Sequence, residues 1–442
     1  MKAVLYDRHG DVDELYVGDV PTPEPASGEA VIRIRACALN GFDPMMLGGT
    51  TGLRVPLPMT PCGDAAGEVT GFGPGTDAAA WEVGDRVMID PVIEGRGMLG
   101  EKAPGAAAEY LAVPLENLVR IPEGVSFEQA AALPVAYGTA LRMIEERARV
   151  QPGETVLVLG ATGGVGSCCV QLCKRIGARV IATGGSARKQ ECLRALGADH
   201  VLPSRSTEMV RQVREIAGRP RYGDPDAGGV DVVINYIGGA TWAASLKVLR
   251  YQGRMVTCGA TAGYDPPTDI RYIWSFEQTI IGSDGWSREG LTRLLDMVAA
   301  GELEPAIHAV RPIGRIRAAM RELTARGYHF RGRTDDMFNS GGENIYPKEV
   351  EDLLLSHPDV LDVAVVPVPH AVKGAVPAAV VRVVSESAVT AEALKRYTLE
   401  RGPAYAHPRR IVLVEEMPLT GVGKVDRAAI LEVLGRAGVG AE

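Results

Sequence analysis

The chain has 442 residues, of which 46% are hydrophobic and 23% are charged, and its net charge is −8. This length exceeds what one hydrophobic core usually supports, so two or three domains are expected. The acidic balance and an aromatic content of only 5% argue against binding to nucleic acid or to a membrane surface.

Targeting and redox signals favour the cytoplasm. No apolar run is long enough to span a bilayer, and the first residues, MKAVLYDRHG, lack the layout of a signal peptide. The seven cysteines form no CxxC pattern and are odd in number, which argues against a closed disulfide framework. We therefore expect a protein of the reducing cytoplasm.

Residues 1–125 predict a β-rich unit with many turns. Apolar and polar residues alternate over 29–39, 66–73 and 84–89, and Gly, Pro or Asp bounds each stretch. Alternation with period two is typical of half-buried strands, and these bounding residues favour turns. The start of the chain is therefore expected to be a barrel-like β domain.

From residue 126 helices and strands alternate. A helical stretch at 127–147 precedes apolar strand candidates at 154–160, 178–183, 199–202, 230–238 and 253–259, with amphipathic helices between them. Apolar strands of this kind are buried on both faces. The α/β pattern predicts a doubly wound parallel sheet.

A glycine-rich turn joins the first of these strands to a helix, within VLVLGATGGVGSCCVQL (156–172). Glycines let the backbone approach a pyrophosphate, and the N-terminus of the helix supplies oriented N–H groups. We predict dinucleotide binding by Gly160, Ala161, Thr162, Gly163, Gly164, Val165 and Gly166. The alternative is a glycine turn that only packs tightly.

The end of the second strand indicates which dinucleotide binds. NAD-binding sites place an acidic residue there for the ribose 2′-hydroxyl. This chain has Ser186, Arg188 and Lys189 instead, and a hydroxyl with two cations suits a 2′-phosphate. NADPH is therefore the predicted cofactor, although the two cations could also form a solvated helix start.

Residues 328–442 have a different texture. Helical patterns at 344–358 and 390–401 alternate with strand candidates at 361–369 and 378–384 and within 409–427. This length suffices for a small α+β domain.

Several separated motifs in order carry a family resemblance. They are NGFD (40–43), GDAAGEVTGFG (63–73), VGDRV (83–87), AAEYLAVP (107–114) and AALPVAYGTAL (131–141). Together with the glycine turn they resemble the quinone-oxidoreductase branch of the medium-chain dehydrogenase/reductase superfamily over roughly 1–328. The resemblance implies a GroES-like catalytic domain at 1–125, completed by 266–327, and a Rossmann domain at 126–265. It also implies an active site in the cleft between them and homodimerisation through the edge of the Rossmann sheet.

The resemblance also bears on metal. Zinc members use a Cys and a His where this chain has Asn40 and Gly63, and the stretch 91–110 lacks the cysteines of the structural zinc lobe. A catalytic zinc needs three protein ligands, which cannot be assembled here. No metal is expected, and Cys37, Cys169 and Cys173 are interpreted as packing residues.

By resemblance Asn40, Asp43 and Thr139 line the nicotinamide end as catalytic residues, although Asp43 could equally be a structural turn carboxylate. Along the sheet edge the resemblance places Asn235, Gly259, Ala260 and Ser283 against the cofactor. The tyrosine that many enoyl-thioester reductases carry shortly after the NxxD motif is missing. Tyr110, Tyr137 and Tyr264 are other possible proton donors, or packing residues.

The C-terminal block resembles the lid domain of adenylate-forming enzymes, most closely aryl-CoA ligases. The resemblance implies a hinge at Arg333 and Asp335, a pantetheine loop at Gly341, Gly342 and Glu343, and an adenylate contact at Lys424. His407, Arg409 and Arg410 would hold CoA phosphates, or form a charged surface strand. The phosphate loop and substrate pocket of such ligases do not occur in the chain, so we do not expect autonomous acid activation.

These patterns lead to one functional hypothesis. We expect an NADPH-dependent, zinc-independent reductase that acts on an activated C=C or carbonyl in an enone, quinone or enoyl thioester. The C-terminal domain would recognise CoA, a carrier protein or a partner ligase. The alternatives are an assembly module whose C-terminal domain docks a separate ligase, and a chimera with an inert tail.

Overall fold

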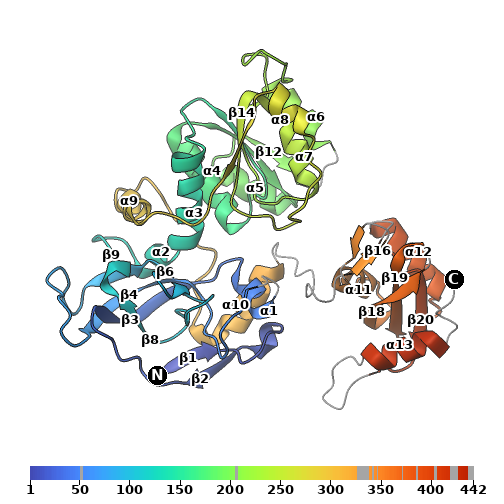
Figure 1. Cartoon of the computed structure of the whole chain (residues 1–442), viewed down its shortest axis with the longest axis horizontal. Coiled ribbons are helices and arrows are strands. Elements are labelled where there is room, and N and C mark those ends of the chain that lie inside the picture. Colours follow the sequence, from blue (N-terminus) through green and yellow to red (C-terminus); the bar gives the residue numbers. More distant parts are fainter. Residues whose placement is uncertain are drawn as a thin grey trace. The chain divides into compact units, whose positions relative to one another are not determined.

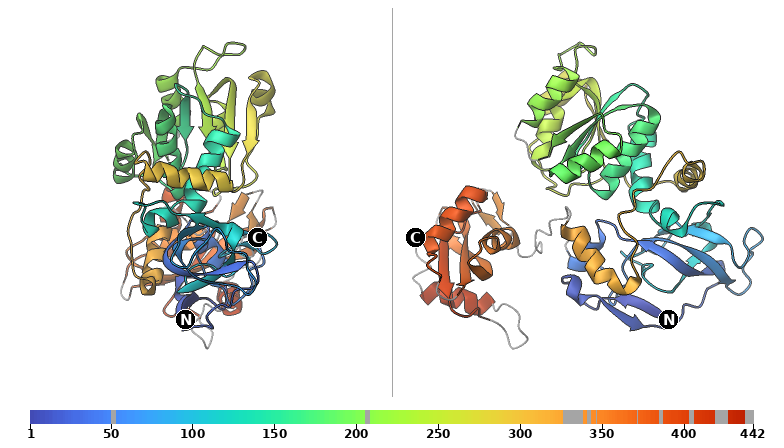
Figure 2. Two further views of the ribbon diagram at one scale, coloured as in Figure 1. Left: turned by 90° about the vertical axis from the view of Figure 1, so that its left-hand side faces the viewer. Right: turned by 180° about the vertical axis from the view of Figure 1, so that it is seen from behind.

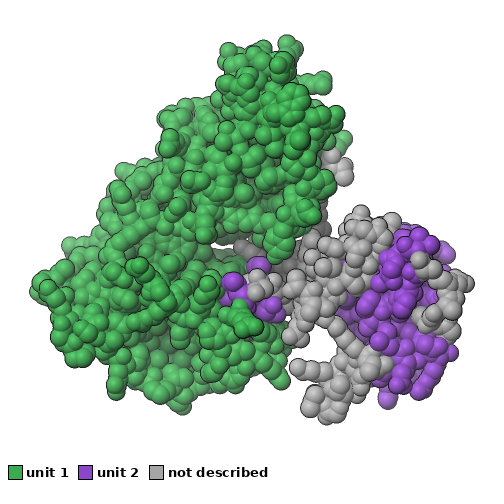
Figure 3. Space-filling model, in the orientation of Figure 1, with its two compact units in different colours: residues 1–43, 54–327 green, residues 44–53, 328–442 purple. Residues whose placement is uncertain are grey.

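The structure is a computed structural model of the chain. It describes residues 1–49, 53–204, 208–325, 338–340, 343–345, 347–370, 372–384, 387–402, 406–418 and 427–436. The chain divides into two compact units, one of residues 1–43 and 54–327 and the other of 44–53 and 328–442 (Figures 1 and 3).

The N-terminal part of the first unit is built from antiparallel strands. Five of them form a sheet in the order β8-β3-β4-β5-β9 around apolar side chains such as Ile32, Val69 and Val87. Their bounds are β3 (Glu29–Ala38), β4 (Asp64–Phe72), β5 (Arg86–Ile89), β8 (Tyr110–Pro114) and β9 (Leu118–Arg120). Two small hairpins accompany the sheet, β1 (Lys2–Leu5) with β2 (Tyr16–Asp19) and β6 (Val92–Ile93) with β7 (Gly97–Met98). The β-rich domain expected at the start of the chain is confirmed.

A helical segment connects this sheet to the second part of the unit. It starts with α2 (Phe127–Ala131), where Ser126 and Gln129 form a reciprocal capping box. It continues as the π-helical turn Pro134–Gly138, α3 (Thr139–Leu141) and the π-helical segment Arg142–Arg147. π-Helical insertions are rare and occur frequently at functional sites.

The second part is a six-stranded sheet in the order β12-β11-β10-β13-β14-β15, and all of its pairings are parallel. The strands are β10 (Thr155–Val158), β11 (Arg179–Gly184), β12 (His200–Pro203), β13 (Val230–Ile234), β14 (Leu249–Thr257) and β15 (Thr279–Gly282). The doubly wound parallel sheet is confirmed. Its sixth strand, β15, lies within 266–327, so part of that segment belongs to the parallel sheet.

Helices cover both faces of this sheet (Figures 1 and 2). On one face the core includes side chains of α4 (Gly164–Ile176) and α5 (Ala187–Ala195). The helix α9 (Arg288–Ala299) instead packs on the π-helical turn Pro134–Gly138 and on β9. On the other face of the sheet the core includes side chains of α6 (Met209–Ala217), α7 (Ala240–Leu246) and α8 (Ile270–Ser275). The last helix, α10 (Ile316–Ala325), returns to the N-terminal part, where the guanidinium of Arg317 donates to the carbonyl oxygen of Leu15. The first unit also contains α1 residue Asp43, whose helix spans Asp43–Gly48.

The second unit contains a five-stranded mixed sheet with two apolar faces. One face packs on α11 (Pro347–Leu355) and α12 (Ala391–Arg401), and the other on α13 (Arg427–Arg436). The strands are β16 (Phe338–Ser340), β17 (Glu343–Ile345), β18 (Val360–His370), β19 (Gly374–Val383) and β20 (Arg410–Val414), and β20 runs parallel to β19. The expected small α+β domain is confirmed.

The described ranges contain no helix long and apolar enough to cross a bilayer. The seven cysteines are all free thiols, and Cys169 and Cys173 lie on α4 and are buried in the core.

Candidate functional site

The glycine turn lies at the carboxyl end of the central strand β10 and leads into α4. Gly160 adopts a left-handed φ of +64°, and Gly163 is the N-cap residue of the helix. Thr162, Gly163, Gly164 and Val165 reach the surface, whereas Ala161 and Gly166 are buried within the turn. The exposed backbone N–H groups at a helix N-terminus form an arrangement suited to a phosphate.

Close approach explains two of the glycines. A Cβ atom on Gly166 would lie 2.6 Å from the carbonyl oxygen of Gly160 and 2.4 Å from the hydroxyl of Tyr236. A Cβ on Gly160 would lie 2.5 Å from a methyl carbon of Ile237. By contrast, a Cβ on Gly164 would meet nothing in the protein closer than 3.9 Å, so the space in front of the helix is open. The turn is therefore tight on its inner side and accessible on its outer side.

Tyr236 is hydrogen-bonded to the glycine turn, a role that the sequence analysis did not predict. Its hydroxyl donates to the carbonyl oxygen of Gly160 at 2.7 Å, and that oxygen also accepts from the backbone N–H of Gly163 at 2.9 Å. The residue follows β13, the neighbour of β10. Only the strand order of the sheet brings it to the turn.

We expect Tyr236→Phe to weaken NADPH binding about 3- to 10-fold, because the lost hydrogen bond fixes the turn. The ring remains, so the substitution removes only the hydroxyl, together with its hydrogen bond and its contact with Gly166. Fluorescence titration of NADPH measures the effect, and Tyr222→Phe, on an exposed tyrosine, is the matched control. Equal affinities for the two variants would contradict this role.

The adenosine end lies where β11 leads into α5. Ser186 is the N-cap residue, and its Oγ accepts from the backbone N–H of Lys189 at 3.3 Å. Arg188 is exposed, and no partner among the described residues engages its guanidinium. The loop 184–190 contains no Asp or Glu. A free cation beside a helix N-terminus favours an anionic group over a ribose hydroxyl.

Asn235 has a different local role from the one the resemblance implies. It is fully buried, and its Oδ1 accepts from the backbone N–H groups of Ile237 and Gly238 at 3.0 and 3.1 Å, while its Nδ2 donates to Ser245 at 3.0 Å. These bonds hold the turn after β13. The side chain thus holds the sheet edge from inside, and its contact with a cofactor stays a prediction.

The other edge residues follow the last two strands. Gly259 is exposed and Ala260 is half-buried just after β14, and Ser283 follows β15. The Oγ of Ser283 is buried and has no hydrogen-bond partner among the described residues. A hydroxyl of this kind has bonding capacity left for a ligand or water.

The N-terminal part of the first unit contributes a buried polar cluster. The carboxyl of Asp43 accepts from the backbone N–H groups of Asn40 at 2.6 Å and Cys62 at 3.0 Å, and Asp43 is 1% exposed. Both oxygens are therefore used by the backbone. These bonds favour the turn-carboxylate alternative for Asp43, and its catalytic role stays a prediction.

Asp64 is the member of this cluster that sequence reasoning missed. One of its oxygens accepts from Asn40 Nδ2 at 2.8 Å, and the other accepts from the backbone N–H of Val135 at 3.0 Å. Asp64 begins β4, whereas Val135 lies in the first π-helical turn, so the carboxyl joins the two parts of the unit. Thr139, 8% exposed, lies one turn further along the same helical segment.

Burial changes the acidity of both carboxyls. It raises the pKa of Asp64 to about 8 and that of Asp43 to about 7, against the opposing effect of the hydrogen bonds that each accepts. These pKa values depend on how completely the fold removes water from each carboxyl.

Stability is expected to fall as the pH rises from about 5 to about 9. Both carboxyls ionise near pH 4 in the unfolded chain but near pH 7 and 8 in the folded chain, so unfolding releases protons in between. Their contribution to the free energy of unfolding is complete below pH 4 and has been lost once the pH exceeds 7–8. Thermal melts should show a Tm decrease on the order of 5 °C. Asp64→Asn should reduce the slope, and an unchanged slope would contradict the assignment.

The tyrosines proposed as donors lie in different surroundings. The hydroxyl of Tyr137 donates to Gln171 at 2.5 Å and accepts from the backbone N–H of Ala306 at 2.9 Å, and burial raises its pKa. Tyr137 therefore packs and links segments. Tyr264 is 78% exposed, and Tyr110 lies on β8.

Comparison with known proteins agrees with this architecture. The alcohol dehydrogenase GroES-like domain family matches residues 26–123, and the zinc-binding dehydrogenase family matches residues 164–300. A solved NAD-dependent alcohol dehydrogenase is 32% identical, with a TM-score of 0.67 over 74% of this chain and 97% of that chain. The chain belongs to the medium-chain dehydrogenase/reductase family. It is an oxidoreductase.

Two further relatives describe the family around it. Human quinone oxidoreductase (Homo sapiens) is 27% identical over 326 residues, which cover 72% of this chain and 92% of that protein. A 2-octenoyl-CoA carboxylase reductase, solved with NADP and 2-octenoyl-CoA, is 25% identical with a TM-score of 0.64 over 73% of this chain and 85% of that chain. Members of the family bind a nicotinamide cofactor, and the glycine turn fits that group in this chain.

The residues present do not fit the catalytic zinc of other family members. Among the described residues no group of three or more His, Cys, Asp or Glu side chains is arranged to hold a metal. Asn40 directs its Nδ2 to Asp64, and a Cβ on Gly63 would lie 3.1 Å from the carbonyl oxygen of Leu99. Zinc independence stays a prediction for this member of the family.

The AMP-binding enzyme C-terminal domain family matches residues 349–424 of the second unit. Arg333, Asp335, Gly341, Gly342 and Lys424 lie outside the described residues, as does the side chain of Glu343, whose backbone is in β17. His407 is half-buried, Arg409 is exposed, and Arg410 begins β20. The backbone N–H of Arg409 donates to the carbonyl oxygen of Pro377 at 2.9 Å.

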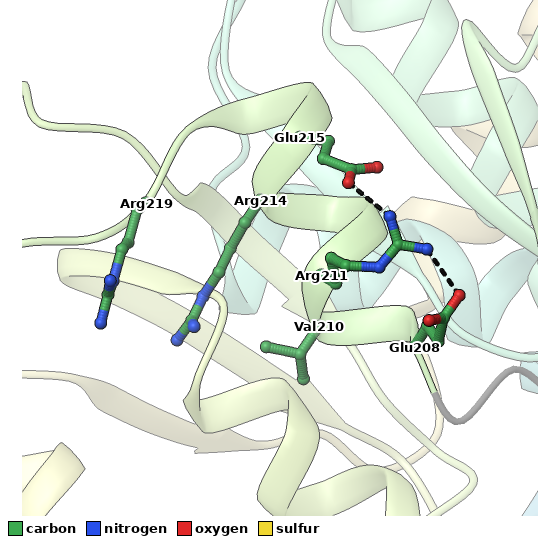
Figure 4. Close-up of a pocket in the computed structure, with 6 residues that line it drawn as sticks. All are labelled: Glu208, Val210, Arg211, Arg214, Glu215 and Arg219. Carbon is green, nitrogen blue, oxygen red and sulfur yellow. Dashed lines mark hydrogen bonds and ion pairs between the residues drawn. The ribbon is translucent and has the colours of Figure 1, made fainter.

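A hollow on the outer side of α6 is separate from these sites. It has a volume of about 560 Å³ and shares no residue with the glycine turn or the Asn40 cluster. Arg211 lies between Glu208 and Glu215 and pairs with both, as Figure 4 shows. Exposed pairs of this kind contribute little free energy and give no sign of a ligand.

Proposed function

We propose that this chain is an NADPH-dependent, zinc-independent reductase that transfers hydride to an activated C=C or carbonyl, as in an enone, a quinone or an enoyl thioester. The observation that carries the proposal is the open glycine turn beside Arg188, with no carboxylate in the loop 184–190. The relatives named quinone oxidoreductase and 2-octenoyl-CoA carboxylase reductase support the substrate classes.

The cofactor would supply the hydride, and the chain would bind and orient both reactants. The N–H groups at the start of α4 would hold the pyrophosphate, and Arg188 and Lys189 the 2′-phosphate. Asn40 and Thr139 would flank the nicotinamide end, where a hydrogen bond to the substrate oxygen polarises it. Exclusion of water from the buried Asn40–Asp64 cluster strengthens such bonds.

The second unit would recognise CoA, a carrier protein or a partner ligase through His407, Arg409 and Arg410. Its support is the match to the AMP-binding enzyme C-terminal domain and the exposed guanidinium of Arg409, which no described residue engages. We further propose a cytoplasmic homodimer that pairs through β15, which is an edge strand of its sheet among the described residues.

The decisive experiment is a panel of quinones, enones and enoyl-CoA thioesters with saturating NADPH or NADH. Turnover with NADPH of at least one class is expected, and failure of the chain to bind NADPH would end the proposal. Arg409→Glu should raise KM for enoyl-CoA and leave KM for a free quinone unchanged, with exposed Arg396→Glu as the control. An unchanged KM for both substrates would favour an inert tail or a docking module.

A further inference from the structure

Asp64 is a buried carboxyl that links two separate segments of the first unit. It is 1% exposed, and its two oxygens accept from two segments far apart in sequence, the side chain of Asn40 and the backbone of Val135. Burying a carboxyl costs free energy unless it is neutral or well bonded. A group retained at such a cost beside the nicotinamide end calls for a function.

We propose that Asp64 is a positioning residue that decides which end of the Asn40 carboxamide faces the substrate. The inference rests on the reductase function proposed above and concerns the same site. It adds a residue that acts through another and sets whether the site offers a hydrogen-bond donor or an acceptor.

The geometry in the structure corresponds to the ionised form of Asp64. A carboxylate only accepts hydrogen bonds, so the group that faces it must be the Nδ2 of Asn40. The carbonyl end of the amide is then turned away from Asp64. Since Asn40 keeps 9% exposure and Asp64 only 1%, the end turned away is the one that can meet a ligand.

Protonation reverses this arrangement. The oxygen near Val135 continues to accept from that backbone N–H, and the other oxygen gains a proton that it can donate. Asn40 can then turn its Oδ1 toward Asp64 to accept this O–H, which leaves Nδ2 facing the substrate. Reduction of a carbonyl or enone develops negative charge on oxygen, which a donor stabilises and an acceptor does not.

The surroundings of Asp64 favour the proton near neutral pH. Burial and, to a smaller extent, the carboxyls of Asp43 and Asp90 raise the pKa of this carboxyl, the bonds from Asn40 and Val135 lower it, and the net value is about 8. The thiols of Cys62 and Cys168 also lie within its electrostatic range. At physiological pH the donor form of Asn40 is therefore the working one.

The bond to Val135 gives the carboxyl a second effect. Val135 and Thr139 belong to one continuous helical segment, Pro134–Arg147. Asp64 therefore fixes the Asn40 amide relative to the segment that carries Thr139. Displacement of about 1 Å between such groups can cost about 100-fold in rate.

The test compares the pH dependence of kcat for the same enone or quinone in wild type and Asp64→Asn. In the variant Oδ1 can still accept from Val135, and Nδ2 faces the Oδ1 of Asn40, which reproduces the protonated arrangement. Wild-type kcat should fall about 10-fold or more from pH 6.5 to pH 9, because a polarising donor is lost. The variant should keep its pH 6.5 rate at pH 9.

Glu29→Gln is the matched control, because Glu29 is a buried carboxyl of the same sheet that pairs with Arg96. It should retain the wild-type profile. Asn40→Leu provides a second variant if Asp64→Asn does not fold, and it should give a low rate without the step near pH 8. A wild-type profile flat to pH 9, or an identical step in Asp64→Asn or Asn40→Leu, would overturn the proposal.

Failure of this inference is distinguishable from failure of the proposed function. NADPH binding is measured separately by fluorescence at both pH values and should not change with Asp64→Asn, because the glycine turn is built by other elements. Absence of NADPH binding in wild type would count against the reductase itself. Binding and turnover with an unaltered pH step in the variant would count only against Asp64.

Discussion

Replacing Gly166 with alanine should lower NADPH affinity about 100-fold, because the added Cβ would displace the turn by about 1 Å. The added Cβ would lie 2.6 Å from the carbonyl oxygen of Gly160 and 2.7 Å from the Cα of Ala161. Both are backbone atoms and cannot rotate away, so the turn itself must move. The exposed N–H groups of α4 would then no longer converge on a pyrophosphate.

Isothermal titration with NADPH measures the loss, and a melt measures any accompanying destabilisation, expected at about 1–3 kcal/mol from overpacking. Gly71→Ala is the control, because a Cβ there meets no atom within 4 Å. It should bind NADPH as the wild type does. If Gly166→Ala bound NADPH with unchanged affinity, the pyrophosphate would not lie at this turn.

Replacing Arg188 with alanine should raise the Kd for NADPH about 10- to 100-fold and leave the Kd for NADH within about 2-fold. A charge-assisted hydrogen bond to a 2′-phosphate is lost, and NADH has no such phosphate. Arg188 is exposed and, among the described residues, engaged by none, so the substitution breaks no internal bond. Its effect should therefore be confined to the ligand.

The control for charge alone is Arg219→Ala, since Arg219 lies in the hollow beside α6. Increasing salt should weaken NADPH binding to the wild type more than to Arg188→Ala, because screening acts on the lost charge pair. If both cofactors lost affinity equally in Arg188→Ala, the cation would serve the fold or the pyrophosphate and the preference for NADPH would need another source.

The spacing of apolar residues along the chain was enough to predict both the antiparallel and the parallel sheet. Alternating residues over 29–39 gave β3, and apolar runs such as 154–160 gave the buried strand β10. These predictions held because side-chain periodicity is fixed by backbone geometry within a single strand. The glycine turn was predictable for the same reason, since the strand, the glycines and the helix are contiguous.

Pairings between distant segments were beyond such reasoning. The placement of β15 beside β14 brings part of 266–327 into the parallel sheet. Asn235 was expected at the cofactor, and its side chain is hydrogen-bonded within the turn after β13 and to Ser245. Whether all polar atoms of a side chain are already hydrogen-bonded depends on its neighbours in the folded structure, which the sequence does not reveal.

By itself the sequence determined a β-rich domain, a parallel α/β sheet, a small α+β domain and a phosphate-binding turn with cations beside it, because each is encoded by residues adjacent in the chain. Only the tertiary structure decided that Tyr236 supports that turn and that Asp64 joins Asn40 to Val135. These contacts bring together residues 24 to 76 positions apart. Burial, which sets the acidity of Asp64, likewise exists only once the strands and the connecting helix have packed and excluded water.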